Sequence, residues 1–165
     1  VLCCSSVSKT LAPGYRVGWV SPGKFKKEIL RTKLYHTISS PTITHEVVGD
    51  FLKNGRYENH LRKIRQILNH NCNNYINTVL ESFPPGTKVS QPQGGFFLWV
   101  ELDKKIDTAA FYHLALQHNI SIDPGRIFSF QNQFSNCMRL SFGLTWSNEL
   151  RIAIQTLGKL AHKQL

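Results

Sequence analysis

The feature that most constrains the fold is a long run of apolar residues at helical spacing between residues 57 and 83. The run advances by three or four residues at each step, which predicts one amphipathic helix over residues 57–82. Its members are Leu61, Ile64, Leu68, Cys72, Tyr75, Val79 and Phe83. A helix of about 25 residues is about 37 Å long, which is enough to bridge two lobes. We therefore expect a structured part on each side of this helix.

The length and the apolar content predict a folded chain. It has 165 residues, of which 41% are apolar, and such a chain buries roughly 70% of its unfolded surface. Its apolar runs are shorter than the roughly 20 residues that a membrane-spanning helix requires, so we expect no membrane contact. The chain begins Val-Leu-Cys-Cys, without an initiator Met or a signal-peptide pattern. This beginning predicts that the sequence starts inside a longer protein.

The charge balance is strongly basic. The chain carries 20 Lys and Arg against 10 Asp and Glu, a formal net charge of +10. Such a balance favours phosphates or acidic partners. However, the basic residues are scattered, and the two small clusters, residues 24–27 and 62–65, fall on predicted helices, where a solvated face is the commoner explanation. The charge alone therefore predicts no sequence-specific recognition of nucleic acid.

The four cysteines predict neither a disulfide framework nor a metal site. Cys3, Cys4, Cys72 and Cys137 contain no C-x-x-C spacing, and the seven His are not paired with them at zinc-ligand spacing. We therefore expect no bound metal. The pattern favours reduced, buried thiols in a cytoplasmic protein.

The parts on the two sides of the long helix differ in character. The first part is predicted to contain a continuously apolar, buried strand over 1–6, a strand over 16–20, and helices over 24–37 and 40–53. On the first of these helices we expect a buried stripe of Phe25, Ile29, Leu30 and Leu34. The second part is predicted to be a small α+β lobe. Its strands fall at 88–91, 96–102, 120–122 and 138–142, and its helices at 107–118 and 147–163.

The residues that carry chemistry lie just after the first predicted strand. Lys9 is surrounded by small hydroxyl residues, and Arg16 follows seven positions later at the start of the next strand. Ligands bind at strand ends in α/β sheets, and a lysine that loses hydration there is a competent amine for Schiff-base formation. Ser6 and Ser8 can donate to a phosphate, which Arg16 can clamp in a bidentate manner. The spacing thus suggests an aldehyde ligand bearing a phosphate, although a loop lysine beside a structural arginine stays open.

The segment Ser-Val-Ser-Lys-Thr-Leu-Ala-Pro-Gly-Tyr-Arg-Val-Gly-Trp, residues 6–19, resembles the cofactor-lysine signature of class I/II aminotransferases. These are fold-type I enzymes that use pyridoxal 5′-phosphate. The seven-residue step from lysine to arginine resembles the aminoadipate-aminotransferase-like subgroup, and above all the aminotransferase-like domain of MocR-type regulators of the GntR family. Residues 55–65, 83–87, 92–100 and 136–143 resemble further family segments in the same order. The resemblance therefore covers nearly the whole chain.

The resemblance implies a role for each residue that matches the motif. Lys9 would be the catalytic residue, forming the internal aldimine with pyridoxal phosphate and moving the proton at the substrate α-carbon. Ser6, Ser8 and Arg16 would hold the cofactor phosphate together with Lys9. Arg139 resembles the arginine that binds the substrate α-carboxylate, with a structural ion pair as its alternative.

Five further residues receive structural or open interpretations. Gly94 and Gly95 would either let the backbone approach the substrate or form a bulge. Asp123, near the pocket in the family pattern, is predicted to fix a turn. Trp19 and Trp99 are predicted to lie in the core.

The resemblance also implies a fold and a division of the chain. The fold would be the α/β fold-type I of pyridoxal-phosphate enzymes, truncated to the end of the large domain, the interdomain helix and the small α+β domain. Residues 1–55 would belong to the cofactor-binding large domain and residues 56–165 to the interdomain helix and the small C-terminal domain. Because the family's upstream residues hold the cofactor ring, we expect this chain alone to be inactive as a transaminase.

Two functions follow from the resemblance. The first is transamination of an amino acid or amine that carries a carboxylate, in a homodimer. The second is ligand sensing by the effector lobe of a MocR-type regulator, which would contact DNA only through an upstream domain that is absent from this sequence. A split or decayed gene product with only a folding role is a third, lesser alternative.

Overall fold

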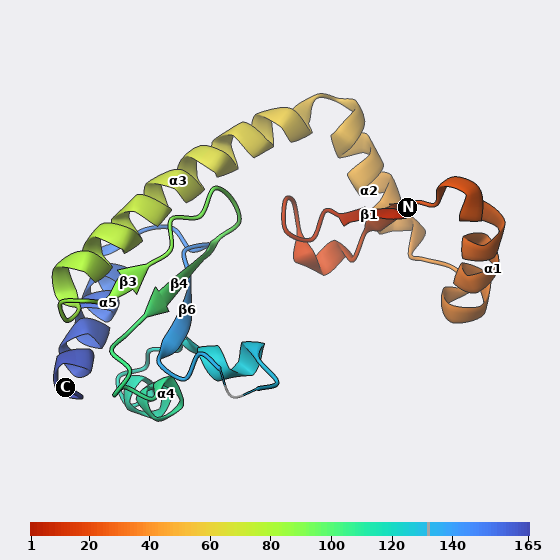
Figure 1. Ribbon diagram of the computed structural model, residues 1–165. Helices are drawn as coiled ribbons and strands as arrows, with labels where there is room; N and C mark the ends of the chain where they lie inside the picture. The colour runs from red at the N-terminus through yellow and green to blue at the C-terminus, as the bar shows by residue number, and fades with distance from the viewer. Residues whose placement is uncertain (132) are drawn as a thin grey trace. The chain divides into compact units, whose positions relative to one another are not determined.

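The computed structural model describes residues 1–131 and 133–165. The chain divides into two compact units, residues 1–63 and residues 64–165, whose helices are labelled in Figure 1 together with strands β1, β3, β4 and β6. The predicted domain boundary between residues 55 and 56 stays a prediction. Each unit is described by itself below.

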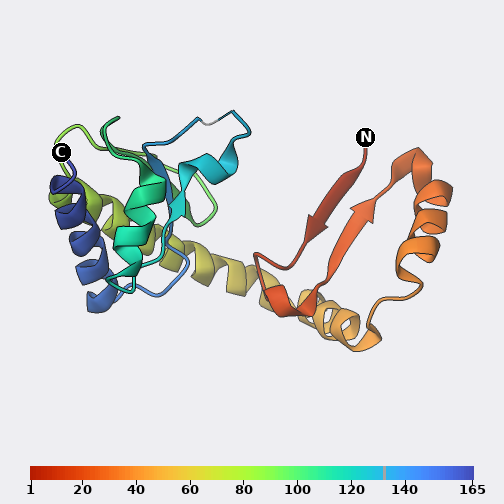
Figure 2. The ribbon, with the colours of Figure 1, turned by 90° about the horizontal axis from the view of Figure 1, so that it is seen from below.

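The first unit combines a two-stranded ribbon with helices. β1 (Cys3–Ser6) and β2 (Gly18–Ser21) pair antiparallel, with Cys3 opposite Ser21 and Ser6 opposite Gly18 (Figure 2). The short 3-10 turns η1 (Pro13–Tyr15) and η2 (Gly23–Phe25) follow the two strands. The helices are α1 (Lys26–Thr37), α2 (Thr42–Lys53) and the start of α3 (Arg56–Ser82).

A small core holds the connection between the two strands. Val7 and Val17 follow and precede the paired residues, and both are buried together with Val48 of α2. Opposite Ser6, a Cβ on Gly18 would lie 2.8 Å from the carbonyl oxygen of Ser5. A larger residue therefore cannot occupy position 18 without moving the ribbon.

The predicted burial in the first unit is wrong for several residues. All eight residues of β1 and β2 are exposed, including Cys3, Cys4 and Trp19, which is 51% exposed. Burial of a sheet requires a second layer on its face, and the small core of this unit contains no residue of either strand. The predicted buried stripe of α1 is exposed for the same reason, apart from a half-buried Ile29.

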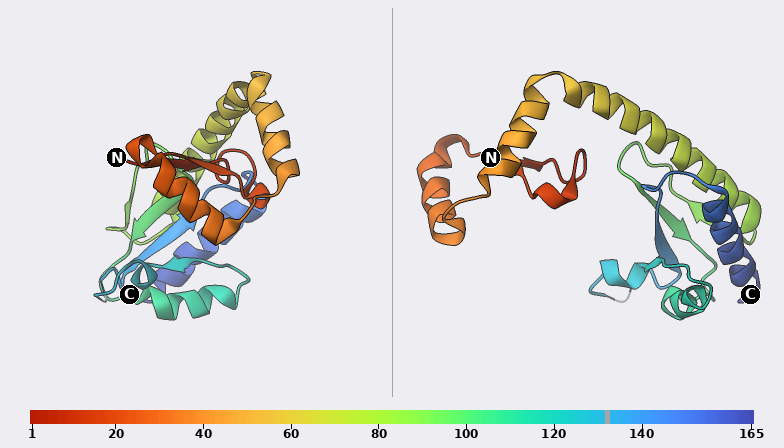
Figure 3. Two further views of the ribbon diagram at one scale, coloured as in Figure 1. Left: turned by 90° about the vertical axis from the view of Figure 1, so that its right-hand side faces the viewer. Right: turned by 180° about the vertical axis from the view of Figure 1, so that it is seen from behind.

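The second unit is an antiparallel sheet packed against helices. Its strands are β3 (Lys88–Val89), β4 (Phe97–Glu101), β5 (Asp123–Pro124) and β6 (Cys137–Ser141), in the order β3-β4-β6-β5. The remainder of α3, α4 (Thr108–Leu116), the 3-10 turn η3 (Gly125–Phe128) and α5 (Asn148–His162) complete the unit. α5 lies beside the C-terminal end of α3 (Figure 3), where a Cβ on Gly158 would collide with the Ser82 backbone. This unit agrees with the predicted α+β lobe.

The core of the second unit uses alternate strand residues and the helical stripe read from the sequence. Leu98 and Val100 of β4 and Met138 and Leu140 of β6 are buried, as expected for one face of an antiparallel pair. α3 begins at Arg56 and ends at Ser82, so the predicted long helix is confirmed. The helical residues buried against the sheet are Tyr75, Val79, Phe111, Ala115, Ile154, Leu157 and Ala161.

One predicted strand is displaced along the chain. Residues 120–122 were expected to form a strand, but β5 begins at Asp123. The reason is the end of α4, where Asn119 has a left-handed φ of 59° and the Ile120 amide donates to the Ala115 carbonyl. This closing turn satisfies the last helical carbonyls, so pairing with β6 starts only beyond it.

Candidate functional site

The lysine singled out in the sequence lies in a tight turn after β1, where the Val7 backbone makes three hydrogen bonds. The Val7 amide donates to the Val17 carbonyl at 3.1 Å, and the Val7 carbonyl accepts from the amides of Leu11 and Ala12. Lys9 lies within this turn and is exposed. The turn brings the segment of Ser6, Ser8 and Lys9 to the same end of the ribbon as Arg16.

Arg16 has a strained backbone. Its φ of 54° and ψ of 36° lie in the left-handed region, which only glycine adopts without steric cost. Such strain amounts to about 1–3 kcal/mol and often accompanies ligand-holding residues. Arg16 is exposed, and the adjoining Val17 is buried in the small core. Because Val17 is anchored in this core, the backbone position of Arg16 is fixed.

The first turns of α3 hold the residue next to the lysine. The Tyr57 hydroxyl donates to the Thr10 hydroxyl at 2.8 Å, and the His60 Nε2 donates to the Thr10 carbonyl at 2.9 Å. The ring of Phe51 contacts the His60 ring edge-on, with centroids 5.8 Å apart. We did not expect the hydrogen bonds of Tyr57 and His60 to Thr10 from the sequence. The only available signal was the i, i+3 spacing of Tyr57 and His60, which places both on one helix face.

Arg139 lies in the second unit, on β6, and its guanidinium is engaged by a carboxylate. Nε and Nη2 both donate to Oδ2 of Asp123, at 3.0 and 2.9 Å. The guanidinium carbon lies 4.1 Å from the centroid of the Phe97 ring and 4.6 Å from that of Phe128. The ion-pair alternative for Arg139 is thus present in the structure. Asp123 pairs with Arg139 across the strands, a role that the predicted turn did not include.

Further aromatic rings extend this cluster. The Trp99 ring contacts Phe128 and Phe134 edge-on, with centroids 5.6 and 5.5 Å apart. Trp99 is half-buried and lies directly opposite Arg139 on the neighbouring strand. The prediction that Trp99 lies in the core is therefore wrong, because it lies on the sheet face opposite to Leu98 and Val100.

Gly94 and Gly95, which precede β4, are not closely packed. A Cβ on Gly94 or Gly95 would meet no atom within 4 Å, although Gly95 has a φ of 79°. The positive φ requires glycine at position 95, and the open space around both residues leaves their two interpretations as predictions.

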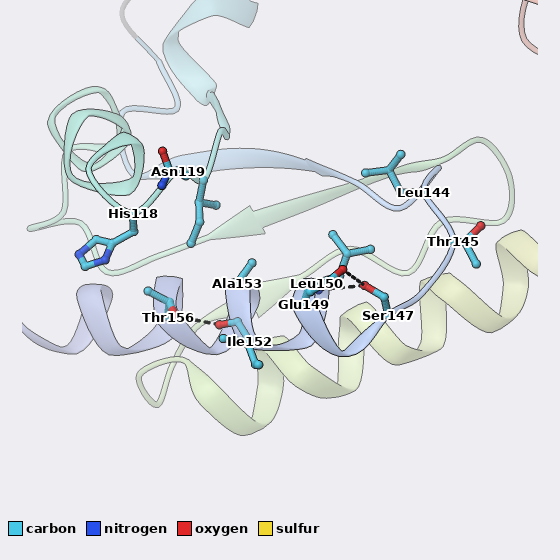
Figure 4. Close-up of a pocket in the computed structure, with 11 residues that line it drawn as sticks. His118, Asn119, Leu144, Thr145, Ser147, Glu149, Leu150, Ile152, Ala153 and Thr156 are labelled. Atoms are coloured by element: carbon cyan, nitrogen blue, oxygen red, sulfur yellow. Dashed lines mark hydrogen bonds between the residues drawn. The ribbon is translucent and has the colours of Figure 1, made fainter.

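A groove of about 680 Å³ lies on the second unit, formed by the end of α4, the loop after β6 and one face of α5 (Figure 4). The sequence did not predict it. Ser147 caps α5 here by accepting from the Leu150 amide. Its charged or titratable side chains are Glu149 and His118, and the remaining lining is apolar or uncharged.

Burial affects three titratable groups of the second unit. It raises the pKa of the Cys72 thiol and of the Tyr75 phenol. It also raises the pKa of the Cys137 thiol, with a further contribution from the nearby Glu101 carboxylate. All three groups are therefore neutral at physiological pH.

The described residues contain neither a cluster of metal-ligand side chains nor a helix that could span a membrane. Among residues 1–131 and 133–165, no three His, Cys, Asp or Glu side chains come together as metal ligands would. Within the same ranges, no helix combines the length and apolar character needed to cross a bilayer.

Comparison with known proteins assigns the family. The sequence model of the aminotransferase class I and II family matches residues 1–157, and the chain belongs to this family. Its mixed helix and sheet structure is that of fold-type I, the fold of the pyridoxal-phosphate-dependent aminotransferases. The resemblance read from residues 6–19 is thereby confirmed at the level of family and fold.

The relatives are of two kinds. The chain is 34% and 36% identical over its whole length to the HTH-type transcriptional regulators YjiR and YdcR of Escherichia coli K12. It is 30% identical to the aminotransferase SSO0104 of Saccharolobus solfataricus. It covers 35% of each regulator and 41% of the aminotransferase, so it spans well under half the length of these proteins.

Solved structures agree with the fold. The kynurenine aminotransferase of Pyrococcus horikoshii has a TM-score of 0.90 and 27% identity, and LysN, the α-aminoadipate aminotransferase of Thermus thermophilus, has 0.88 and 25%. The match to the kynurenine aminotransferase includes 100% of this chain and 41% of the enzyme chain. The match to LysN includes 99% of this chain and 42% of the enzyme chain.

Proposed function

We propose that this chain supplies the lysine, the phosphate-binding residues and the carboxylate-binding arginine of a pyridoxal-phosphate-dependent aminotransferase-like protein. The observation that carries the proposal is the turn at Lys9, which brings Ser6, Ser8, Lys9 and Arg16 to one end of a two-stranded ribbon. The family membership supports the same cofactor, as does the Pyrococcus horikoshii kynurenine aminotransferase, which was solved in complex with pyridoxamine phosphate.

The residues at this end of the ribbon fit a phosphate-bearing aldehyde. Two hydroxyls and a guanidinium are suited to a phosphate dianion, and a primary amine is suited to an aldehyde. The sequence between Val1 and Lys27 contains no Asp or Glu, so no carboxylate of this segment would repel the phosphate. Ser6, Lys9 and Arg16 are exposed and Ser8 is half-buried, which leaves the set accessible.

Each residue would then have a distinct task. Ser6, Ser8 and Arg16 would hold the phosphate, and the Nζ of Lys9 would hold the aldehyde and later carry the proton at the substrate α-carbon. When bound, pyridoxal phosphate supplies an electron sink for the bonds at that carbon. Thr10, held by Tyr57 and His60, would keep the lysine turn in place.

Arg139 would bind the carboxylate of an amino-acid or amine substrate or effector. Its planar guanidinium suits a carboxylate, and its bonds to Asp123 use only Nε and Nη2. In the division that we propose, residues 1–55 belong to the cofactor-binding large domain and residues 56–165 to the interdomain helix and small domain. We further propose a cytoplasmic homodimer, in keeping with the family.

A second function, the effector lobe of a MocR-type DNA-binding regulator, is supported by one specific observation. The two Escherichia coli regulators are 34% and 36% identical to the chain, whereas the aminotransferase SSO0104 is 30% identical over a similar length. In this case Lys9 would hold the same cofactor but serve detection of an amino compound, and DNA contact would belong to another domain of such a regulator.

Borohydride reduction tests the cofactor site. After incubation with pyridoxal phosphate and reduction, in a protein that also contains the upstream part of the large domain, we expect mass spectrometry to place the added pyridoxyl group on Lys9, and Lys9→Ala to abolish it. Lys33→Ala, an exposed lysine of α1, serves as the matched control and should retain the label. A label spread over other lysines, or none, would contradict the proposal.

Addition of an amino acid separates the two functions in a protein that joins this chain to the upstream cofactor-binding part that its longer relatives carry. An enzyme releases the corresponding keto acid and leaves the amine form of the cofactor behind. A sensor exchanges the amino acid at Lys9 without releasing keto acid. Chromatographic detection of the keto acid therefore decides between them.

A further inference from the structure

Three residues form a row across neighbouring strands of the second unit. Asp123 of β5 lies directly opposite Arg139 of β6, and Arg139 lies directly opposite Trp99 of β4. Directly opposed residues of antiparallel strands point to the same face of the sheet. Met138 and Leu140, the neighbours of Arg139, are buried in the core on the other face. The row thus presents a carboxylate, a guanidinium and an indole on the face away from the core.

The position of the guanidinium has two independent supports. One is the pair of hydrogen bonds to Asp123. The other is the contact with the rings of Phe97 and Phe128, at 4.1 and 4.6 Å. A cation near aromatic rings is attracted by their faces whether or not a carboxylate is present. Asp123 is therefore not the sole group that keeps Arg139 in position.

The negative charge of Asp123 also offsets the positive charge of Arg139, to which a ligand carboxylate would bind. The side chains of Arg139 and Asp123 are 31% and 41% exposed, so both are within reach of a ligand. An incoming carboxylate would gain hydrogen bonds from Arg139 and would meet repulsion from Asp123 at close range. The incoming carboxylate must therefore share Arg139 with Asp123 or displace the Asp123 carboxylate from it.

We propose that Asp123 is a specificity-determining residue that competes with ligand carboxylates for Arg139. The inference rests on the proposed function in one respect, namely that Arg139 binds the ligand's carboxylate. It adds that small monocarboxylates bind poorly, because they cannot offset the competition. Carboxylates with an aromatic or apolar body bind better, because they also contact the rings of Phe97 and Phe128.

Arginine-detected NMR provides the test. In ¹⁵N-labelled protein, the Nε–Hε resonance of Arg139, assigned by its absence from Arg139→Lys, is followed during titration with 3-phenylpropionate. Asp123→Asn removes the charge with little change of shape. We expect it to lower the Kd for 3-phenylpropionate by about two- to fivefold, the range expected for a partly exposed charge pair. The uncharged 3-phenylpropionamide should show no such gain.

The structure provides a matched control for the change in charge. Asp107 is a second aspartate paired with an arginine, Arg126, at 2.9 Å and with 42% exposure. Asn is as good an N-cap as Asp for α4. Asp107→Asn should therefore leave the Kd unchanged, whereas Asp123→Glu, which retains the charge, should remain close to wild type. If Asp123→Asn is unstable by circular dichroism, Asp123→Ala is measured in the same way.

The outcomes separate this inference from the proposed function. An unchanged or weakened carboxylate affinity in both Asp123→Asn and Asp123→Ala would overturn the competition and leave Asp123 as a positioning residue. Absence of a saturable Arg139 shift in every protein would overturn it as well. In either case, pyridoxyl labelling of Lys9 reports separately whether the proposed cofactor site exists.

Discussion

The hydroxyl of Tyr57 donates a hydrogen bond of 2.8 Å to the hydroxyl of Thr10, 47 residues earlier in the chain and directly after Lys9. Tyr57→Phe removes this bond and little else. We expect it to lower the free energy of unfolding by about 1 kcal/mol and to slow pyridoxyl labelling of Lys9. A urea titration and the labelling rate measure the two effects.

The control for this substitution is Tyr35→Phe on the exposed surface of α1, where Tyr35 is 71% exposed. It should change neither quantity. Equal labelling rates in Tyr57→Phe and wild type would show that the first turn of α3 does not position the lysine turn.

Gly18 permits the close approach of β1 and β2 beside the candidate phosphate-binding residues. In Gly18→Ala the new Cβ would lie 2.8 Å from the Ser5 carbonyl oxygen and 3.2 Å from the Ser6 Cβ. Such overpacking costs about 1–3 kcal/mol, so we expect a lower melting temperature and weaker labelling of Lys9. Gly14→Ala, with no atom within 4 Å of its Cβ, should melt as wild type does. Identical melting of the two variants would contradict the crowding argument.

Arg139 should affect the ligand and not the cofactor. We expect Arg139→Ala to weaken exchange of an amino acid at Lys9 by about tenfold, because a charge-assisted hydrogen-bonding partner of the carboxylate is lost. Pyridoxyl labelling in the absence of an amino acid should stay at the wild-type level. The control is Arg126→Ala, which removes an ion-paired arginine from the same unit. A parallel loss of labelling in Arg139→Ala would show that this residue supports the fold instead.

The thiols should differ in reactivity. Burial raises the pKa of Cys72 and Cys137 above the ordinary value of 9.0, whereas Cys3 and Cys4 are exposed. Because the thiolate is the reactive form, iodoacetamide at pH 8 should modify Cys3 and Cys4 first. Peptide mass spectrometry over time measures the order. Simultaneous modification of all four without urea would contradict the burial of Cys137.

The same raised pKa values predict a dependence of stability on pH. The folded state holds the protons of Cys72, Tyr75 and Cys137 more tightly than the unfolded state does. Their contribution to the free energy of unfolding is therefore complete below about pH 9, and it is lost as the pH rises through the pKa values of the folded state. Urea titrations at pH 8 and pH 10.5 should show a smaller free energy of unfolding at the higher pH. Cys137→Ala should reduce this difference.

The sequence predicted the second unit better than the first. The helical periodicity from Leu61 to Phe83 identified α3 because a helix that packs one face on a sheet must repeat at that spacing. The apolar residues of β1 predicted a buried strand, but burial depends on a covering layer that no local pattern describes. The exposure of Trp19 and Cys3 is the result.

The sequence predicted which residues form the candidate sites. It did not predict which other side chains contact them. Lys9 and Arg16 are close in sequence, so the motif sufficed to bring them to one turn. The pairing of Asp123 with Arg139 depends on strand register, and the start of β5 was displaced by the end of α4. The contact of Tyr57 with Thr10 joins residues too far apart for any local pattern to connect them.

The three backbone hydrogen bonds of Val7 have a consequence for motion. Val7 has no exposed surface, and its bonds to Val17, Leu11 and Ala12 close a ring of backbone around Lys9. Amide protons held in this way exchange with solvent only when the ring opens. In deuterium oxide the amides of Val7, Leu11 and Ala12 should thus persist longest in the first unit. Lys9, the proposed cofactor lysine, would then lie in the slowest-opening backbone of the first unit.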